Sequence, residues 1–479
     1  MPDHATSPVF DLGVTADETG RMTFQHQLPL FNWYYPFDRS PVGERVPLSA
    51  IGRMAAKGRR IALYLHIPFC DTICSFCPFS RGRFRDDTEV TRYVNALIQE
   101  IRTVTDGLGG VLRPDAVFIG GGTPSVVSPD DLRRLGASLA EHIDLSRVQE
   151  FSCELEAKSA SEQVMDALCD VGVSRVSFGV QTLSPRLRRL LALTASPAQI
   201  ERTAVLANER FTTTNVDVIY GLPGQTEAEL LRDIELARAL GSSTIDFYPL
   251  NNLAAQPRLH TAADLLSAPM LDAATRRRFR HRILEQLGTA GYLPVSGYCF
   301  APAPRSRSDQ HPVSNHRTFL YHDIVYGYAD DIVLGFGAGA FSILPGMNVY
   351  TEGDRRRYVE LSGQRDEIRV GFPTGPAAER GVVGFPYRGS LDRTRVDWSA
   401  VPIEVLDALD SSLVGGLADE SEPGTIRLTD RGWFDYVNYM YLLMPTSSKQ
   451  WLTERIEIRR AAGGRVESTA LFARHGRPE

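Results

Sequence analysis

Between residues 59 and 345, short apolar segments with the composition of β-strands alternate with amphipathic segments. The expected strands are residues 61–67, 116–120, 151–155, 175–179, 215–221 and 244–250. Segments 130–143 and 227–240 have the apolar periodicity of helices. Because continuous apolar strands separated by helices form parallel sheets that helices cover, the pattern predicts an α/β fold. Sites in such folds lie just after the strands, so we expect functional residues there.

The segments on either side of this region differ from it. Residues 1–58 form an irregular lead segment, and residues 363–389 are rich in Gly, Arg and Pro and are interpreted as an excursion or linker. The pattern then predicts a helix over 403–417, followed by a strand, a turn and a helix over 425–444. We therefore expect three parts: a lead segment (1–58), a central domain (59–345) and a small C-terminal winged-helix-like α+β domain (346–479).

Composition excludes several classes of function. The chain has 479 residues, 43% of them hydrophobic, which is enough for two or three domains. Its net charge of −6 argues against a nucleic-acid partner. The polar N-terminus lacks the apolar core of a signal peptide, and no apolar run approaches the roughly 18 residues of a membrane helix. We therefore expect a soluble cytoplasmic protein without a membrane or nucleic-acid partner.

Three of the six cysteines lie within the segment YLHIPFCDTICSFCPFS (64–80). Cys70, Cys74 and Cys77 have the spacing Cys-x3-Cys-x2-Cys. Iron–sulfur clusters prefer thiolate ligands, and three thiolates leave one iron of a [4Fe–4S] cluster open to another ligand. Zinc with His66 as a fourth ligand is the alternative, although His66 would point along the preceding strand.

The remaining cysteines, Cys153, Cys169 and Cys299, lack a metal-binding spacing, and we expect buried or inert thiols there. Phe76 lies between the last two cysteines of the motif and is expected to shield a cluster from water.

At the cysteine motif the chain resembles the HemN-like branch of the radical S-adenosylmethionine (SAM) enzymes. The pattern Y-x-H-I-P-F-C, typical of that branch, stands at residues 64–70. Similar motifs follow in order: FIGGGTPS (118–125), ELEAKS (154–159), RVSFGVQTLSP (175–185), NVDVIYGLPGQT (215–226) and LGFGAGAFS (334–342). The resemblance covers roughly residues 60–345. It implies a partial (β/α)6 TIM-like barrel whose cluster holds SAM through its open iron.

The resemblance also implies roles for residues that follow the strands. The loop after the second strand would contact the SAM amino group, Glu154 would lie near SAM, Gln181 would hydrogen-bond SAM, and Asp217 would suit the ribose hydroxyls. The expected cofactor-binding residues are Phe76, Gly120, Gly121, Gly122, Thr123, Glu154, Gln181 and Asp217. The expected metal ligands are Cys70, Cys74 and Cys77, and the expected catalytic residues are Tyr64, His66 and Glu154.

The chain departs from the branch pattern at two places. Leu193 stands where an Arg is thought to bind the SAM carboxylate, and Arg189, one helical turn earlier, is a candidate substitute. Segment 293–327 lacks the Glu of the coproporphyrinogen oxidases and chaperones, and Asn315–His316 reverses their His-Asn pair. The N-terminal Y-x-T-Y-P pattern of the oxidase is also missing.

These departures favour a class C radical SAM methylase or cyclopropanase. In that class the resemblance implies two SAM molecules: one yields a 5′-deoxyadenosyl radical, and the other supplies a methyl or methylene group to an sp² carbon. The substrate would be an aromatic or conjugated natural-product intermediate. Polar and aromatic residues of the segment 293–328 are candidates for the acid/base group. They are Tyr298, His311, His316, Tyr321, His322 and Tyr326.

Three other functions remain open: oxygen-independent coproporphyrinogen III oxidation, anaerobic haem degradation by methyl transfer, and a non-enzymatic haem chaperone. The oxidase would need basic residues for propionates, which the Arg-rich segment 363–389 offers. Each enzyme of this kind needs a reducing electron donor such as flavodoxin or ferredoxin, and a partner methyltransferase is a further candidate.

Overall fold

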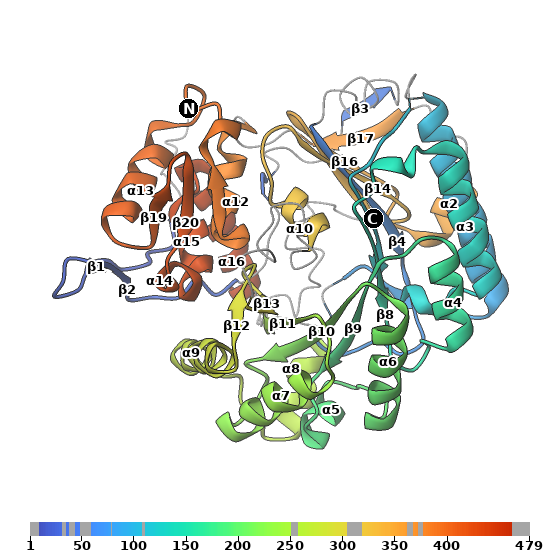
Figure 1. Ribbon diagram of the computed structural model, residues 1–479, viewed down its shortest axis with the longest axis horizontal. Coiled ribbons are helices and arrows are strands. Elements are labelled where there is room, and N and C mark those ends of the chain that lie inside the picture. Colours follow the sequence, from blue (N-terminus) through green and yellow to red (C-terminus); the bar gives the residue numbers. More distant parts are fainter. Residues whose placement is uncertain are drawn as a thin grey trace.

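A sheet of thirteen strands lies at the centre of the molecule, in the order β12-β13-β11-β10-β9-β8-β7-β4-β14-β15-β16-β17-β3. The computed structural model of the chain describes residues 9–30, 35–37, 44–47, 59–77, 79–107, 111–250, 257–303, 319–361, 367–371 and 377–461. Figure 1 shows helices along the outer side of the curved sheet and the C-terminal elements, in orange and red, on the opposite side.

Six consecutive parallel strands form the part of the sheet that the sequence predicts. They are β4 (Arg60–Ile67), β7 (Ala116–Gly121), β8 (Glu150–Leu155), β9 (Arg175–Gln181), β10 (Thr213–Tyr220) and β11 (Thr244–Pro249). The helices between them are α2 (Asp87–Gly107), α3 (Pro129–His142), α4 (Glu162–Asp170), α5 (Pro185–Leu190), α6 (Pro197–Arg210) and α7 (Glu227–Ala239). Neighbours in the chain are parallel neighbours in the sheet. The expected α/β fold with a partial (β/α)6 barrel is confirmed.

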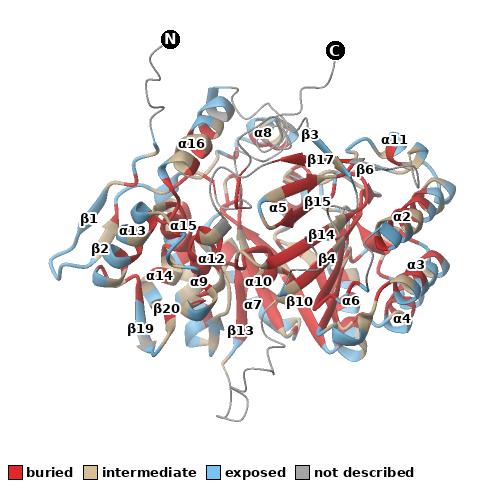
Figure 2. Cartoon of the chain, turned by 90° about the horizontal axis from the view of Figure 1, so that it is seen from above, coloured by how far each residue is buried: buried red, intermediate tan, exposed pale blue. Residues whose placement is uncertain are grey.

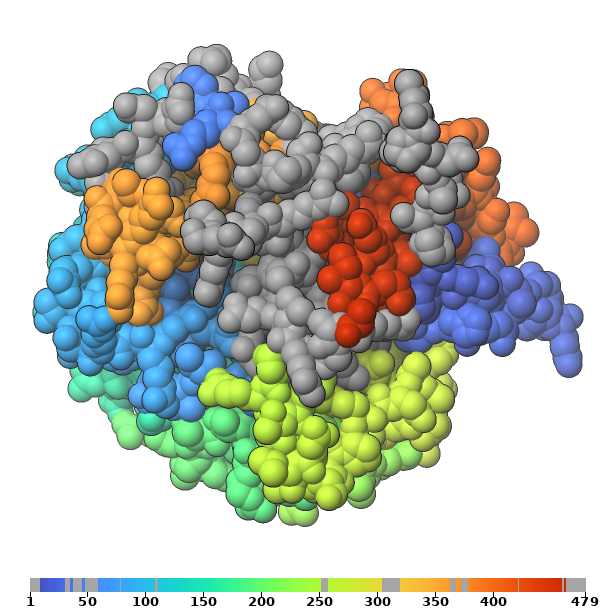
Figure 3. Space-filling view, turned by 180° about the vertical axis from the view of Figure 1, so that it is seen from behind, coloured from blue at the N-terminus to red at the C-terminus, as the bar shows by residue number. Residues whose placement is uncertain are grey.

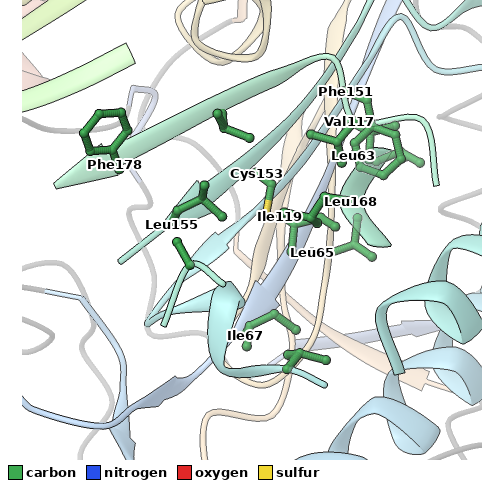
Figure 4. Packing of buried hydrophobic residues seen from close by; sticks show 14 of the residues in the cluster. Leu63, Leu65, Ile67, Val117, Ile119, Phe151, Cys153, Leu155, Leu168 and Phe178 are labelled. Atoms are coloured by element: carbon green, nitrogen blue, oxygen red, sulfur yellow. The ribbon is translucent and has the colours of Figure 1, made fainter. Parts of the chain in front are cut away.

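The two faces of these strands differ in character. Outer side chains are apolar and belong to one buried cluster with residues of the helices. Figure 4 shows Leu65 and Ile119 of this face close to Leu168 of α4. Because side chains alternate along a strand, the intervening residues, such as Tyr64 and Glu154, face the inner side. Burying a large apolar side chain stabilises the fold by about 1.5–3 kcal/mol. The outer face therefore carries much of the stability and leaves the inner face free for polar groups.

Capping residues begin the helices that follow the strands. Ser128 accepts a hydrogen bond from the backbone N–H of Asp131 at the start of α3. Thr226 and Glu229 form a reciprocal capping box at the start of α7. Each cap contributes about 1 kcal/mol, so the sequence itself specifies where these helices begin.

The sheet continues beyond the boundary expected at residue 345. The further strands on this side are β14 (Asp331–Phe336), β15 (Phe341–Leu344), β16 (Met347–Tyr350), β17 (Glu367–Gly371) and β3 (Glu44–Pro47). Leu344 pairs with Met347 across a two-residue turn in which Gly346 has a φ of +77°. The expected boundary therefore falls within a hairpin, and β3 joins part of the expected lead segment to the sheet. α11 (Arg355–Glu360) follows β16.

At the other edge, two strands pair antiparallel beside β11. They are β12 (Tyr292–Pro294) and β13 (Cys299–Pro302), preceded by α8 (Pro257–Leu265) and α9 (Ala273–Thr289). α10 (Leu320–Val325) contacts β4, β7 and β14 from the inner side. Figure 2 shows the strands of the sheet as the largest buried region, in red, with exposed helix surfaces around it.

The C-terminal part contains five helices and a three-stranded sheet among its described residues. The helices are α12 (Arg380–Arg388), α13 (Ile403–Val414), α14 (Asp430–Phe434), α15 (Tyr436–Leu442) and α16 (Thr446–Ala461). The strands, in spatial order, are β18 (Ser390–Asp392), β20 (Thr425–Leu428) and β19 (Ala418–Glu422). The elements expected over 403–417 and 425–444 are therefore present.

The prediction of a linker over residues 363–389 is wrong for α12. Val382, Val383 and Phe385 of this helix are fully buried. A Cβ atom at Gly384 would lie 2.3 Å from the backbone oxygen of Tyr326, so only glycine allows this close approach. Glycines that resemble a flexible segment in the sequence are here a packing surface.

The N-terminal residues pack on the C-terminal part. The hairpin of β1 (Val14–Ala16) and β2 (Met22–Phe24) lies beside the orange and red elements in Figure 3. The N–H of Met22 donates to the backbone oxygen of Gly415, and the N–H of Leu28 donates to Oδ1 of Asn438, at 2.9 and 3.0 Å. Segments expected as separate domains thus share one core.

Candidate active site

The cysteine loop is anchored at both ends. It begins at β5 (Phe69–Cys70), which pairs with β6 (Gly82–Arg83). The buried ring of Phe69 packs edge-on against Tyr93, with centroids 5.1 Å apart. Farther along, the N–H and the hydroxyl of Ser75 donate to the backbone oxygens of Leu191 and Leu190, at 3.1 and 3.0 Å. These contacts fix the loop at the carboxyl end of β4.

The three thiols of the motif lie within electrostatic reach of one another. Burial raises the pKa of Cys70 to about 11 and that of Cys74 to about 12, and it also raises the pKa of Cys77. The charges of Cys77 and Cys70 contribute to the shift at Cys74. The hydroxyl of Thr123 hydrogen-bonds Cys70. Thiolates in such a place need cationic partners, and the irons of a cluster supply that charge. The donor set therefore fits a [4Fe–4S] cluster.

His66 and Tyr64 form a fixed pair on the inner face of β4. Burial lowers the pKa of His66 to about 4, so its imidazole is neutral. Nε2–H donates to the backbone oxygen of Ser80 at 2.9 Å, and Nδ1 accepts from the hydroxyl of Tyr64 at 2.6 Å. Because both ring nitrogens are engaged, His66 does not offer a fourth ligand to zinc.

The glycines of the loop 120–123 are required by close packing. Gly121 has a φ of +116°, and a Cβ atom there would lie 2.4 Å from Nδ1 of His66. A Cβ atom at Gly122 would lie 2.5 Å from the backbone oxygen of Phe69. The N–H of Gly122 donates to the backbone oxygen of Ile67 at 2.8 Å. This loop therefore holds β4 and the cysteine loop tightly together, a role that the motif did not reveal.

Glu154 ends β8 beside this glycine loop. Its Oε2 accepts from the N–H of Gly121 at 2.9 Å. Burial raises its pKa to about 7, against the opposing effects of that hydrogen bond and of Arg175. Its charge also raises the pKa values of Cys70 and Cys77, so the carboxyl lies near the cysteine loop. The structure thus brings Glu154, the glycine loop and the cysteines together.

The shifted pKa of Glu154 predicts a pH dependence of stability. Between pH 4.5 and pH 7 the folded chain retains a proton that the unfolded chain has released, so the free energy of unfolding falls as pH rises. Relative to Glu154→Gln, we expect a loss of about 2 kcal/mol between pH 5 and pH 8. Denaturant unfolding of the cluster-free protein and the variant at both pH values measures it, and parallel pH curves would contradict it.

Gln181 adopts a strained backbone conformation. Its φ is +65°, and the N–H of Thr182 donates to the backbone oxygen of Val180 at 2.8 Å across it, which is a γ-turn. The register of β9 and β10 shifts here, as expected of a bulge. Asp233 holds the turn by accepting from the Thr182 hydroxyl and the Leu183 N–H, both at 2.7 Å. Strain of this kind costs about 1–3 kcal/mol and persists where function uses it.

Gln181→Gly is expected to separate stability from ligand binding. Glycine tolerates the positive φ, so the free energy of unfolding should rise by about 1 kcal/mol. SAM affinity should fall roughly tenfold if the amide hydrogen-bonds SAM. Thermal unfolding and equilibrium dialysis with SAM measure the two effects. Gln199→Gly, in an exposed capping box, is the control and should lower stability without changing SAM affinity.

Asp217 lies on the inner face of β10 in a polar network. The hydroxyl of Ser177 lies 3.1 and 3.0 Å from its two carboxylate oxygens, and the amide of Asn215 donates to Oδ1 at 2.7 Å. Burial and the nearby carboxyls of Asp246 and Glu154 raise the pKa of Asp217 well above its usual range. Asp217 is paired in register with Gly179, two residues before Gln181. The expected SAM residues Glu154, Gln181 and Asp217 therefore lie on three adjacent strands.

The region around Leu193 is apolar. Leu193 and Phe76 pack against the same buried cluster, whose members are Leu187, Leu190, Leu191, Ile219, Leu222, Leu250, Leu259 and Ala263. Arg189 is exposed, whereas its neighbour Arg188 is buried and donates to the backbone oxygens of Val180, Thr182 and Ala195. Arg188 therefore holds the Gln181 turn. Arg258 of α8, which sequence analysis did not single out, donates to the backbone oxygen of Ile73 in the cysteine loop.

Aromatic side chains line the inner face below these residues. The ring of Phe118 lies 5.7 Å from Tyr64, 4.7 Å from Tyr321 and 5.2 Å from Phe319, measured between centroids. Nδ1 of His322 and the hydroxyl of Tyr387 share a hydrogen bond of 2.7 Å. Burial, with the charge of Arg175, lowers the pKa of His322 to about 3. Of the other predicted acid/base candidates, Tyr298 and Tyr326 pack on Tyr387, and His311 and His316 lie outside the described residues.

Several residues of this inner face were missed by sequence analysis. Arg175, Asp246 and Tyr387 are buried among the groups described above. Arg175 opens the motif RVSFGVQ, and its spacing from Gln181 places both on one face of a strand, which is a usable signal. Tyr387 lies in the segment interpreted as a linker, so no local pattern linked it to the barrel.

Part of the chain is similar to known proteins. Residues 64–237 match the model of the radical SAM superfamily. The chain is 32% identical over 286 residues to anaerobilin synthase of Escherichia coli O157:H7, covering 59% of this chain and 61% of that protein. It is 27% identical over 319 residues to the haem chaperone HemW of Lactococcus lactis, covering 64% and 75%.

The structure of coproporphyrinogen III oxidase (HemN) from Escherichia coli has the same fold, with a TM-score of 0.68, 22% identity, and coverage of 87% of this chain and 97% of that one. In the part of the chain that the structure describes, none of the helices combines the length and apolar character needed to cross a membrane.

Proposed function

Because residues 64–237 of this chain belong to the radical SAM superfamily, we propose that it transfers a methyl or methylene group to an sp² carbon of a planar conjugated substrate. Its cofactors are a [4Fe–4S] cluster and SAM, and the proposal includes a second SAM as the carbon donor. The reduced cluster and SAM together supply a 5′-deoxyadenosyl radical. Cys70, Cys74 and Cys77 would hold the cluster.

The observation that carries this proposal is the aromatic inner face. Tyr64, Phe118, Phe319 and Tyr321 form a continuous wall beside Glu154 and the glycine loop. Such a wall offers stacking surface to a planar ring and excludes water from it. Tyr64 and Phe118 lie in the same row of the sheet as Ser152. Glu154 and Ser177 pair with each other in the next row toward the carboxyl ends of the strands. A ring on the wall would therefore lie one row below the expected SAM residues.

The pair of His322 and Tyr387 would handle the proton that methyl or methylene addition releases. His322 is neutral, and its Nδ1 shares a hydrogen bond with the hydroxyl of Tyr387, so Nε2 is the ring nitrogen left for the substrate. Ser296 hydrogen-bonds Tyr387, whose pKa burial raises well above its usual range. A hydrogen-bonded chain of neutral groups can pass a proton without separating charge.

A second candidate function is methyl transfer to a haem-type macrocycle. The observation that favours it is the 32% identity to anaerobilin synthase, the highest among the relatives described above. Both candidates use the same inner face, and they differ in the size of the conjugated ring that it receives.

Product analysis tests the proposal. The protein is reconstituted anaerobically, reduced with a flavodoxin or ferredoxin system, and supplied with SAM and an aromatic or porphyrin substrate. We expect 5′-deoxyadenosine and S-adenosylhomocysteine in comparable amounts, and a substrate gain of one carbon. Formation of 5′-deoxyadenosine alone, with carbon dioxide released from a coproporphyrin precursor, would replace the proposal with oxidative decarboxylation. An intact cluster without SAM cleavage would favour the chaperone.

A further inference from the structure

Arg175 is a buried guanidinium without full hydrogen bonding. It starts β9, on the same face as Gln181, and is 3% exposed. Its Nη1 has no hydrogen-bond partner among the described residues. A buried polar group left in this state destabilises the fold, and more so when it is charged. Such groups need an explanation, and an absent ligand is one.

The groups around Arg175 leave its guanidinium available for a ligand. Of the acids around Arg175, Glu150 has the largest electrostatic effect on its pKa. The Glu150 carboxylate accepts hydrogen bonds from the N–H groups of Leu320 and Tyr321, at 3.1 and 3.5 Å, and so caps α10. Phe319 covers one face of the guanidinium, with its ring centroid 4.1 Å from Cζ.

The other titratable groups that influence Arg175 are carboxyls and a thiol. Asp246 accepts from the hydroxyl of Tyr248 at 2.8 Å, and Asp217 is held by Ser177 and Asn215. Burial raises the pKa values of Glu150, Asp217, Asp246 and Cys299, so the neutral forms of these groups are favoured. Arg175 therefore keeps its positive charge, whereas the acidic groups around it favour their neutral forms.

We propose that Arg175 binds a carboxylate of the substrate, so that the substrate of the proposed reaction is a planar conjugated carboxylic acid. This inference rests on the proposed function and names its substrate class. The guanidinium presents a planar fork that matches a carboxylate, and its stacking on Phe319 continues the aromatic wall. A singly charged carboxylate is favoured over a phosphate, because one guanidinium balances one negative charge and a second buried charge would have no cationic partner.

The position of Arg175 suits this role. The register places Tyr64, Phe118, Ser152 and Arg175 in one row across four strands. Glu154 lies two residues farther along β8 than Ser152, which is about 7 Å. An acid held by Arg175 would therefore extend its ring along the aromatic wall toward the SAM residues. The charge of Arg175 also lowers the pKa of His322, so His322 lies within electrostatic reach of this arginine.

Binding of acids and their esters tests the proposal without turnover. The probes are 2-naphthoate and coproporphyrin III, with methyl 2-naphthoate and coproporphyrin III tetramethyl ester as neutral counterparts. Each is titrated by fluorescence into the reconstituted protein with SAM. We expect at least one acid to bind on the order of tenfold more tightly than its ester. Equal affinity of acid and ester, or no binding of either acid, would overturn the proposal.

Variants assign the preference to Arg175. Arg175→Gln should remove the difference between acid and ester, whereas Arg175→Lys should retain part of it. Arg280→Gln is the matched control, because Arg280 is 4% exposed, lies over aromatic rings and also has an Nη1 without a hydrogen-bond partner among the described residues. It differs from Arg175 in its position, because it belongs to α9 and its Nη2 donates to the backbone oxygen of Trp433. The control should leave the preference unchanged. If Arg175→Gln does not fold, the comparison of acid and ester on the unmodified protein and on Arg175→Lys decides.

The binding result is independent of the proposed reaction. Preference for acids without carbon transfer would retain Arg175 as a carboxylate site and reject the proposed function. Carbon transfer to a substrate that binds equally well as an ester would retain the function and reject the role of Arg175.

Discussion

Cys74→Ala is expected to abolish SAM cleavage. The thiol of Cys74 lies within electrostatic reach of Cys70 and Cys77, and alanine leaves only two thiolates for the cluster. Loss of groups that merely support metal ligands costs roughly 10–100-fold, so loss of a ligand should cost more than about 100-fold in 5′-deoxyadenosine formation. Anaerobic reconstitution, with iron and sulfide analysis and visible absorbance, should show the cluster lost or depleted.

The matched control for this prediction is Cys169→Ala. Cys169 is exposed and lies outside the motif, so its removal should leave iron content and SAM cleavage unchanged. Full cluster absorbance and SAM cleavage in Cys74→Ala would show that the assignment of the three ligands is wrong. Equal losses in both variants would indicate a general effect of cysteine removal rather than ligation.

Arg380→Met is expected to lower the free energy of unfolding by roughly 3–5 kcal/mol. The guanidinium is 3% exposed and donates to four backbone oxygens, those of Tyr328, Asp331, Ile324 and Val325. Methionine fills the space but leaves these acceptors buried without donors. Burial lowers the pKa of Arg380 to about 10, so the loss should persist from pH 5 to pH 8. Denaturant unfolding at both pH values measures it.

Arg388→Met is the control on the same helix. Arg388 is partly buried, donates to the backbone oxygen of Gly381 at 2.8 Å and lies over the ring of Tyr328. With fewer acceptors left behind, its replacement should cost about 1 kcal/mol. A similar loss in both variants would contradict the role assigned to Arg380. No loss in Arg380→Met would mean that α12 docks through its apolar contacts alone.

Much of the fold followed from local sequence patterns. The order of strands and helices over 59–345 was predicted from apolar periodicity, and the six strands agree with the structure to within two residues. These signals are local, because a strand or a capped helix reveals itself within about ten residues. The domain boundary expected at residue 345 falls within a hairpin, because local signals mark a turn but not its role in the fold. Gly346 indicates a turn, and the sequence does not distinguish a turn within a hairpin from the end of a domain.

Some features of the candidate site were also predicted from the local sequence, and others needed the structure. Three cysteines within eight residues determine the kind of cofactor, because thiolate number and spacing are read directly from the chain. Resemblance extended this to the residues expected around SAM, but the tight packing of Gly121 against His66 and the γ-turn at Gln181 needed the structure.

Tertiary structure alone decided what surrounds the proposed substrate site. Nη1 of Arg175 has no hydrogen-bond partner among the described residues, whereas the nearby Glu150 caps α10, an element about 170 residues away in the chain. Tyr387 reaches His322 only because α12 docks against the barrel through its glycines. Periodicity and spacing describe neighbours along the chain, whereas these contacts depend on how distant segments pack. The sequence by itself therefore determined the sheet and the cysteine motif, and packing between distant elements decided the inner face that we propose as the substrate site.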